Sequence, residues 1–212
     1  MKNIFFLPTL IFLMTVAISA QGFKIKASGN QTFNFEDKSG RNQVTFFSQT
    51  PLEDINGTAN GIGGSISFDV ANFAKTIRGK LTVQVSSMNT GIELRNKHMQ
   101  SSNWLESQEY PEISFEIKSV SDVNQTADNK LEFKVKGDFS MHGVTKEVIA
   151  SGDVTYLDES ELTKKRAPGD LLGIRAKFSV NLSDYGVDNA VIGNKVSEKI
   201  DIGVNVVGSN AK

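Results

Sequence analysis

The sequence contains no cysteine and only two histidines. The absence of cysteine excludes disulfides, thiol catalysis, a lipid-modified cysteine and a zinc or iron site held by thiolates. Two histidines leave few candidates for a general base at neutral pH. Neither sign of charge predominates, since 23 Lys and Arg stand against 24 Asp and Glu. A near-neutral chain lacks the basic surface that nucleic-acid binding requires, so we expect no nucleic-acid partner.

Long apolar runs are absent except at the N-terminus, where residues 4–18 are mostly apolar and follow Lys2. This pattern is typical of a secretory signal peptide, because no second span or charged stop-transfer flank follows it. We expect residues 1–20 to be cleaved and residues 21–212 to form a single domain with no transmembrane anchor. An exported chain without cysteine is typical of bacteria, and we expect a periplasmic or secreted protein.

Alternation of apolar and polar residues dominates the rest of the chain. In LEFKVKGDFSM the apolar side chains are those of Leu131, Phe133, Val135, Phe139 and Met141. The same alternation runs through residues 144–156, 172–182 and 200–206, with shorter versions at 44–46, 66–70, 81–85 and 113–117. A period of two indicates strands with one buried face. The chain is therefore predicted to be all-β, with about eight antiparallel strands.

Such strands either split into a sandwich or close into a barrel. Their length and the hairpin connections between them favour an extended antiparallel barrel, because long open edges invite aggregation. The interior of an eight-stranded barrel is either filled by side chains or wide enough for one small ligand. The alternation does not choose between these two interiors, because core residues and pocket residues have the same pattern.

Two segments contain the histidines. His142 and Gly143 lie between two alternating runs, which predicts a tight turn and a geometric role for the histidine. Residues 88–112 interrupt the alternation, and within them Ile92, Arg95 and Met99 fall near one face of a predicted short helical insertion. His98 belongs to the same segment. No spacing supplies a nucleophile or a set of metal ligands, so no catalytic residue, metal or cofactor is predicted.

The order of four segments resembles the YceI-like family. They are TGIELRNKHM at 90–99, NWLESQEYPEISFEI at 103–117, GDFSMHGVTKEV at 137–148 and FSVNLSDYGV at 178–187. The resemblance implies a lipocalin-like barrel with a polyisoprenoid or another amphipathic lipid in its apolar interior. The positions that match the family motifs, most of them structural, are Thr90, Gly91, Arg95, His98, Tyr110, Pro111, Phe115, Gly137, His142, Gly143, Asp184, Tyr185 and Gly186. The family often has Asp where this chain has Asn96.

The prediction is an exported protein that sequesters or carries such a lipid and is not an enzyme. The residues predicted to line the pocket are Phe46, Phe68, Leu81, Val83, Val85, Ile113, Phe115, Phe133, Phe139, Phe178 and Tyr185. Arg95 and His98 are predicted to form a polar rim, with Arg95 suited to a phosphate or carboxylate.

Two alternatives stay open. One is a solid barrel that acts through its surface in an envelope stress or adhesion role, and the other is an enzyme with a rim site at Glu93, Arg95 and His98. A homodimer is also open, with a barrel edge or the charged loop 158–170 as its contact.

Overall fold

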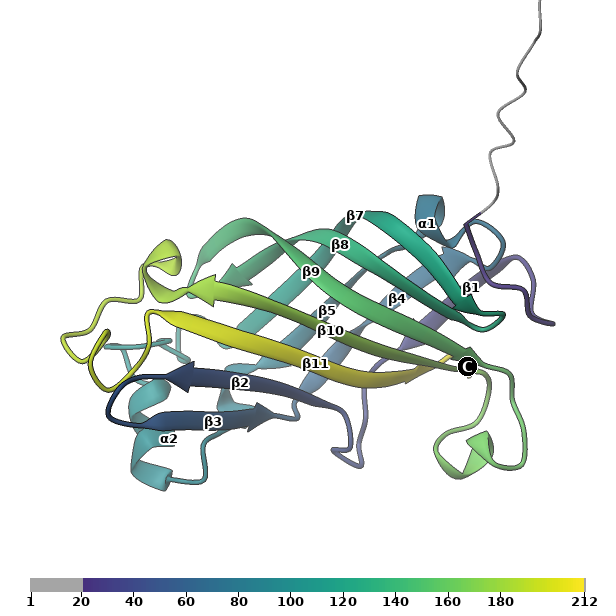
Figure 1. Cartoon of the computed structure of the whole chain (residues 1–212). Coiled ribbons are helices and arrows are strands. Elements are labelled where there is room, and N and C mark those ends of the chain that lie inside the picture. The colour runs from purple at the N-terminus through teal and green to yellow at the C-terminus, as the bar shows by residue number, and fades with distance from the viewer. Residues whose placement is uncertain (1–20, 212) are drawn as a thin grey trace, which may run out of the picture.

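A computed structural model describes residues 21–211 (Figure 1). The predicted signal peptide, residues 1–20, lies outside the described residues. The strands are β1 (Asn30–Asn34), β2 (Gln43–Gln49), β3 (Asp54–Ala59), β4 (Ile62–Asp69), β5 (Arg78–Gln84), β6 (Met88–Asn89), β7 (Glu112–Ala127), β8 (Lys130–Met141), β9 (Val144–Leu157), β10 (Leu171–Asn181) and β11 (Lys199–Ser209). The helices are α1 (Phe73–Thr76) and α2 (Glu93–Met99), with 3-10 turns η1 (Val85–Ser87), η2 (Thr163–Lys165) and η3 (Leu182–Tyr185).

The predicted all-β barrel is confirmed. Eight strands form a closed antiparallel ring in the order β1, β4, β5, β7, β8, β9, β10 and β11, and β11 returns to β1 where Ser209 pairs with Asn34. β2 and β3 extend the sheet from the first half of β11, and the two-residue β6 pairs with the end of β3. Figure 1 shows α1 and α2 near opposite ends of the barrel. Within residues 21–211, no helix is long and apolar enough to cross a membrane.

The alternation assigns the two faces of the long strands as predicted. Along β8, the side chains of Leu131, Phe133, Val135, Phe139 and Met141 are buried, as is Gly137, and the polar residues between them are exposed or partly exposed. The outer face carries cross-strand ion pairs, because opposite charges on adjacent strands come within reach of one another. Lys118 on β7 lies 2.6 Å from Asp138 on β8, and Lys136 lies 3.0 Å from Glu147 on β9.

The strand β11 changes partner from β2 to β1, and Asn42 supplies hydrogen bonds at this point. Its fully buried amide donates to the carbonyl oxygens of Phe35 and Val207 at 3.0 and 3.1 Å, and its Oδ1 accepts the Val207 N–H at 2.9 Å. Arg166 donates to the same Oδ1 at 2.8 Å and to the carboxylate of Asp37 at 3.0 Å. The loop 158–170 is therefore fastened to the barrel at Arg166, although most of its residues are exposed or partly exposed.

The turn predicted at His142 joins β8 to β9. His142 and Gly143 have φ angles of 51° and 75°, and two consecutive positive values match a type I′ hairpin turn. The Nδ1 atom of His142 lies 3.0 Å from the carbonyl oxygen of Tyr185, so Nδ1 carries the proton in this contact. The ring also packs edge-on against Tyr110 at a centroid distance of 5.1 Å. His142 thus connects the turn between β8 and β9 to the segments that carry Tyr110 and Tyr185.

Candidate functional site

The barrel encloses one large cavity of about 700 Å³, within the range of small-molecule pockets. Its walls are inward-facing apolar side chains of the strands, among them Val44, Phe46, Leu81, Val83, Ile113, Phe115, Val135, Phe139, Ala176, Phe178, Ile202 and Val204. These residues lie on the faces that the alternation predicts to be buried. The interior is therefore hollow over part of its length.

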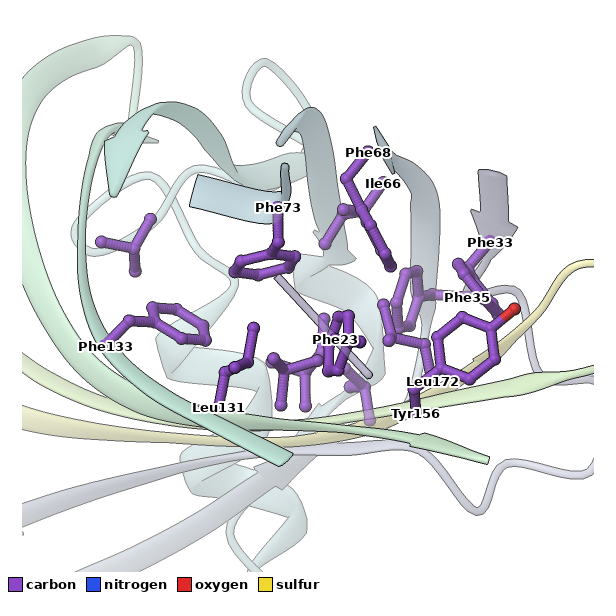
Figure 2. Close-up of a cluster of buried hydrophobic side chains, with 14 of the residues drawn as sticks. Phe23, Phe33, Phe35, Ile66, Phe68, Phe73, Leu131, Phe133, Tyr156 and Leu172 are labelled. Atoms are coloured by element: carbon purple, nitrogen blue, oxygen red, sulfur yellow. The ribbon is translucent and has the colours of Figure 1, made fainter. Parts of the chain in front are cut away.

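The end of the barrel that carries α1, here called the closed end, is filled by aromatic side chains (Figure 2). The ring of Phe73, on α1, is fully buried and lies 5.1 Å from Phe68 and 5.4 Å from Phe23, between ring centroids. Phe133 lies 5.6 Å from Phe73 on the cavity side of this cluster. The other aromatic members are Phe33, Phe35 and Tyr156. This cluster closes one end of the cavity.

The opposite end, here called the open end, is formed by α2, the turn at 50–53 and the segment 187–196. The polar side chains that line the cavity here come from these segments and from residues just before and after α2: Glu53, Thr90, Arg95, His98, Ser101, Asn103, Asn189 and Lys195. Ile92 and Leu94 also line the cavity and are exposed at 49% and 62%. Apolar walls thus lead to a partly polar opening, an arrangement suited to a ligand with an apolar chain and a polar end.

Arg95 reaches the opening from α2 and forms an ion pair with Glu53 on the 50–53 turn. Its Nη2 atom donates to Glu53 Oε2 at 3.1 Å, and the two side chains are 29% and 40% exposed. A guanidinium carries five N–H donors, and this contact uses one of them. Arg95 therefore combines a positive charge with further hydrogen-bonding capacity at the lip of the cavity.

Asn96 holds the start of α2 in place. Its Oδ1 accepts the N–H and the hydroxyl of Thr90, both at 2.8 Å, and its Nδ2 donates to Asn89 Oδ1 at 2.9 Å. An aspartate at this position would keep the two bonds from Thr90 and lose the bond to Asn89, since a carboxylate has no donor. The role of position 96 in this chain is to orient the segment that carries Arg95.

The structure places most, but not all, of the predicted pocket residues on the cavity wall. Those that line it are Phe46, Leu81, Val83, Ile113, Phe115, Phe133, Phe139 and Phe178, with Arg95 and His98 at the open end. Three do not line it: Phe68, Val85 and Tyr185. Phe68 faces inward but belongs to the aromatic cluster of the closed end, whereas Val85 and Tyr185 lie on 3-10 turns in a second buried cluster.

Tyr185 is part of the packing and not of an acid–base site. It is 1% exposed, and its ring meets Phe139 edge-on at 5.5 Å. Burial, with a smaller contribution from the charge of Asp184, raises the pKa of the Tyr185 phenol to about 12. The phenol is therefore neutral at physiological pH.

Several wall residues were missed by the sequence prediction. Ile200, Ile202 and Val204 carry the same alternation as the predicted wall residues, so that signal was present in the sequence. Met88, Trp104 and Leu105 come from parts of the segment 88–112 where no periodicity indicates which side chains turn inward, whereas Met99 lies on the helix face predicted with Ile92 and Arg95. This segment supplies much of the open end.

The residues of the proposed rim enzyme do not converge. Glu93 is absent from the cavity wall, is 83% exposed and pairs with Lys97 at 2.7 Å. Arg95 and His98 line the opening. Among residues 21–211, no three His, Cys, Asp or Glu side chains are grouped so that they could hold a metal ion. The geometry supplies a binding cavity and gives no support to a rim site built on Glu93.

Comparison with known proteins assigns the family. The family model described as YceI-like domain matches residues 16–208. The chain belongs to the YceI-like family. It is 29% identical over 178 residues to a UPF0312 protein of Pseudomonas fluorescens, a match that covers 83% of this chain and 86% of that protein. It is 26% identical over 156 residues to the protein YceI of Escherichia coli O157:H7, which covers 74% of each chain.

Solved structures share the fold of this YceI-like protein. BcnA of Burkholderia cenocepacia matches with a TM-score of 0.61 and 17% identity, over 79% of this chain and 96% of BcnA. A polyisoprenoid binding domain from Saccharophagus degradans, implicated in plant cell wall breakdown, matches with a TM-score of 0.60 and 12% identity. That match covers 87% of this chain and 100% of the domain. At these identities, the likeness concerns the fold.

Proposed function

We propose that this protein is an exported lipid-binding protein that sequesters or carries a polyisoprenoid or another amphipathic lipid. The observation that carries the proposal is the cavity of about 700 Å³ with apolar walls, one end filled by aromatic rings and the other partly polar. The structural likeness to a polyisoprenoid binding domain supports the same class of ligand. The proposal requires no chemical reaction.

Burial of the chain supplies the free energy of binding. Removal of apolar ligand surface from water contributes about 25 cal/mol per Å² before the costs of ordering the ligand are subtracted. The polar end stays at the opening, because burying it without a partner would cost free energy. Arg95 is placed to donate to it, and a phosphate or carboxylate suits a guanidinium best.

Export is the remaining part of the proposal. Its support is the sequence pattern of residues 1–20, which is typical of a cleaved signal peptide. A periplasmic or secreted location follows from cleavage, and mass spectrometry of the protein recovered from the periplasm of the native host tests it. The expected mature N-terminus lies at Gln21, and a protein that retains residues 1–20 in the cytoplasm would contradict it.

The only tryptophan of the chain provides a direct binding assay. Trp104 lines the cavity at its open end, and the sequence contains no other tryptophan. Titration of the mature protein with geranylgeraniol should change its fluorescence in a saturable manner, and the Trp104→Phe variant should give no such signal. A flat titration, together with no protein-bound geranylgeraniol after gel filtration, would contradict lipid binding.

A further inference from the structure

The closed end of the barrel fixes where the cavity stops. On three strands, the exposure of the inward side chains falls to about zero toward this end. Ile174 is 8% exposed and Leu172 is 0% on β10, and Phe133 is 8% and Leu131 is 0% on β8. Val204 is partly exposed and Val206 is 1% on β11. The cavity ends on β8 at Phe133, because Phe133 lines it and Leu131 does not, whereas Leu172 and Val206 still line it on β10 and β11. The floor of the cavity therefore lies beside Phe133.

Phe133 and Phe73 form this floor. Both residues line the cavity, and their ring centroids are 5.6 Å apart. The ring of Phe73 is fully buried and packs against the rings of Phe23 and Phe68 (Figure 2). Phe23 is held in turn by a hydrogen bond from its N–H to the Val70 carbonyl oxygen at 2.9 Å. A close-packed aromatic layer of this kind resists displacement by a ligand.

We infer that Phe133 and Phe73 limit the length of the lipid chain, so that this protein prefers chains of about five or six isoprene units to longer ones. This inference rests on the proposed function. A cavity of about 150 Å³ holds one benzene molecule, or about 25 Å³ per carbon atom. A cavity of about 700 Å³ therefore holds about 25 to 30 carbon atoms, whether the chain is straight or folded back. Any further units remain outside in water.

A competition between chain lengths tests the limit. Phosphatidylcholine vesicles that carry equal amounts of geranylgeraniol, geranylfarnesol, hexaprenol, heptaprenol and solanesol are incubated with the mature protein. The protein is then separated from the vesicles, and its bound prenols are extracted and quantified by mass spectrometry. The free energy of transferring an isoprene unit from the bilayer to the cavity is close to zero, whereas each isoprene unit left in water costs free energy. Retention should be level up to five or six units and should fall at least about tenfold for each further unit.

Three variants locate the limit at the floor. Phe133→Ala removes one ring from the floor and should extend the limit by about one isoprene unit. Ala176→Phe adds a ring to the wall, one inward position beyond Ile174 toward the open end, and should shorten the limit by about one unit. Leu131→Ala is the matched control, because Leu131 is also buried on β8 but does not line the cavity. It should leave the limit unchanged.

The outcomes separate the length limit from the proposed function. Retention that stays level up to solanesol, or a limit that is the same in all variants, would overturn the role of Phe133 and Phe73 and leave lipid binding intact. If the wild-type protein retained no prenol of any length, lipid binding and the length limit would both be overturned. A limit that moves in opposite directions in Phe133→Ala and Ala176→Phe supports the inference, even where one variant is less stable.

Discussion

The guanidinium of Arg95 lies 3.1 Å from the carboxylate of Glu53, and this ion pair joins α2 to the turn between β2 and β3 at the opening of the cavity. Both side chains are partly exposed, so the pair contributes at most about 1 kcal/mol to the free energy of unfolding. An ion pair of this strength can exchange partners. We propose that an anionic lipid head takes the place of Glu53 beside Arg95.

This geometry predicts how the two residues affect ligand preference. Arg95→Ala should weaken binding of geranylgeranyl phosphate by roughly fivefold or more and leave binding of squalene, which has no polar head, unchanged. Glu53→Gln should strengthen binding of the phosphate, because a like charge is removed. The measurement is the titration monitored by Trp104 fluorescence, with urea unfolding as the control for stability. Equal loss of both ligands in Arg95→Ala would show that Arg95 does not contact the head.

Asp37 makes stability depend on pH at the closed end. Burial alone would raise the pKa of Asp37, but the hydrogen bond from Arg166 and those from the N–H groups of Ser39, Asn42 and Arg41 outweigh it and lower the pKa to about 2. A lowered pKa in the folded state stabilises the fold above the unfolded pKa of about 4, and this stabilisation is lost as the pH falls toward about 2.

The corresponding variant is Asp37→Asn. At pH 7 it should lower the free energy of unfolding by about 1 to 2 kcal/mol, since the charge-assisted bond to Arg166 is weakened. The difference between wild type and variant should shrink as the pH falls below about 4 and should nearly vanish near pH 2. Urea unfolding at a series of pH values measures this. A difference that is constant with pH would show that the charge of Asp37 does not matter.

The turn at His142 predicts a contrast between two neighbouring substitutions. Asparagine adopts positive φ readily, so His142→Asn should keep the turn and lose the bond to the Tyr185 carbonyl oxygen and the ring contact with Tyr110, at a cost of about 1 kcal/mol. Gly143→Ala should cost about 2 kcal/mol or more, because it adds strain at positive φ and puts a Cβ 2.7 Å from the Tyr110 ring. Urea unfolding measures both.

A binding assay distinguishes a structural role of His142 from a direct role in ligand binding. His142→Asn should leave the affinity for geranylgeraniol unchanged, since His142 does not line the cavity. A variant that folds as stably as the wild type but no longer binds the prenol would assign His142 a direct part in function. The same titration on Gly143→Ala is interpretable only at temperatures where that variant is folded.

The alternation predicted the barrel and which face of each strand is buried, because a period of two depends only on neighbouring residues. It did not distinguish Phe68 from Phe46, since both face inward, and only their level along the barrel axis separates the packed end from the hollow end. That level depends on register between strands distant in sequence. The aromatic cluster also depends on Phe23, on an irregular segment, and on Phe73, on the four-residue helix α1, and neither segment is long enough to show a periodicity. Hence the choice between a filled and a hollow interior required the structure, which contains both.

The residues of the open end show the same limit of prediction from local sequence patterns. Val85 extends the alternating pattern of residues 81–85, but the chain leaves β5 after Gln84 and Val85 turns into a second buried cluster. Arg95 and His98 were placed at the opening through their position in a family motif. The partner of Arg95, Glu53, lies 42 residues away in sequence, and no local pattern indicates their contact.

The most direct test of the central claim is the content of the cavity. Mature protein purified without detergent from its native host is extracted with organic solvent and analysed by mass spectrometry, beside the Ala176→Phe variant prepared in the same way. Lipid binding predicts a long-chain lipid in stoichiometric amount in the wild type and less of it, or a shorter chain, in the variant. An empty wild-type protein that also fails to take up added prenols would contradict the account.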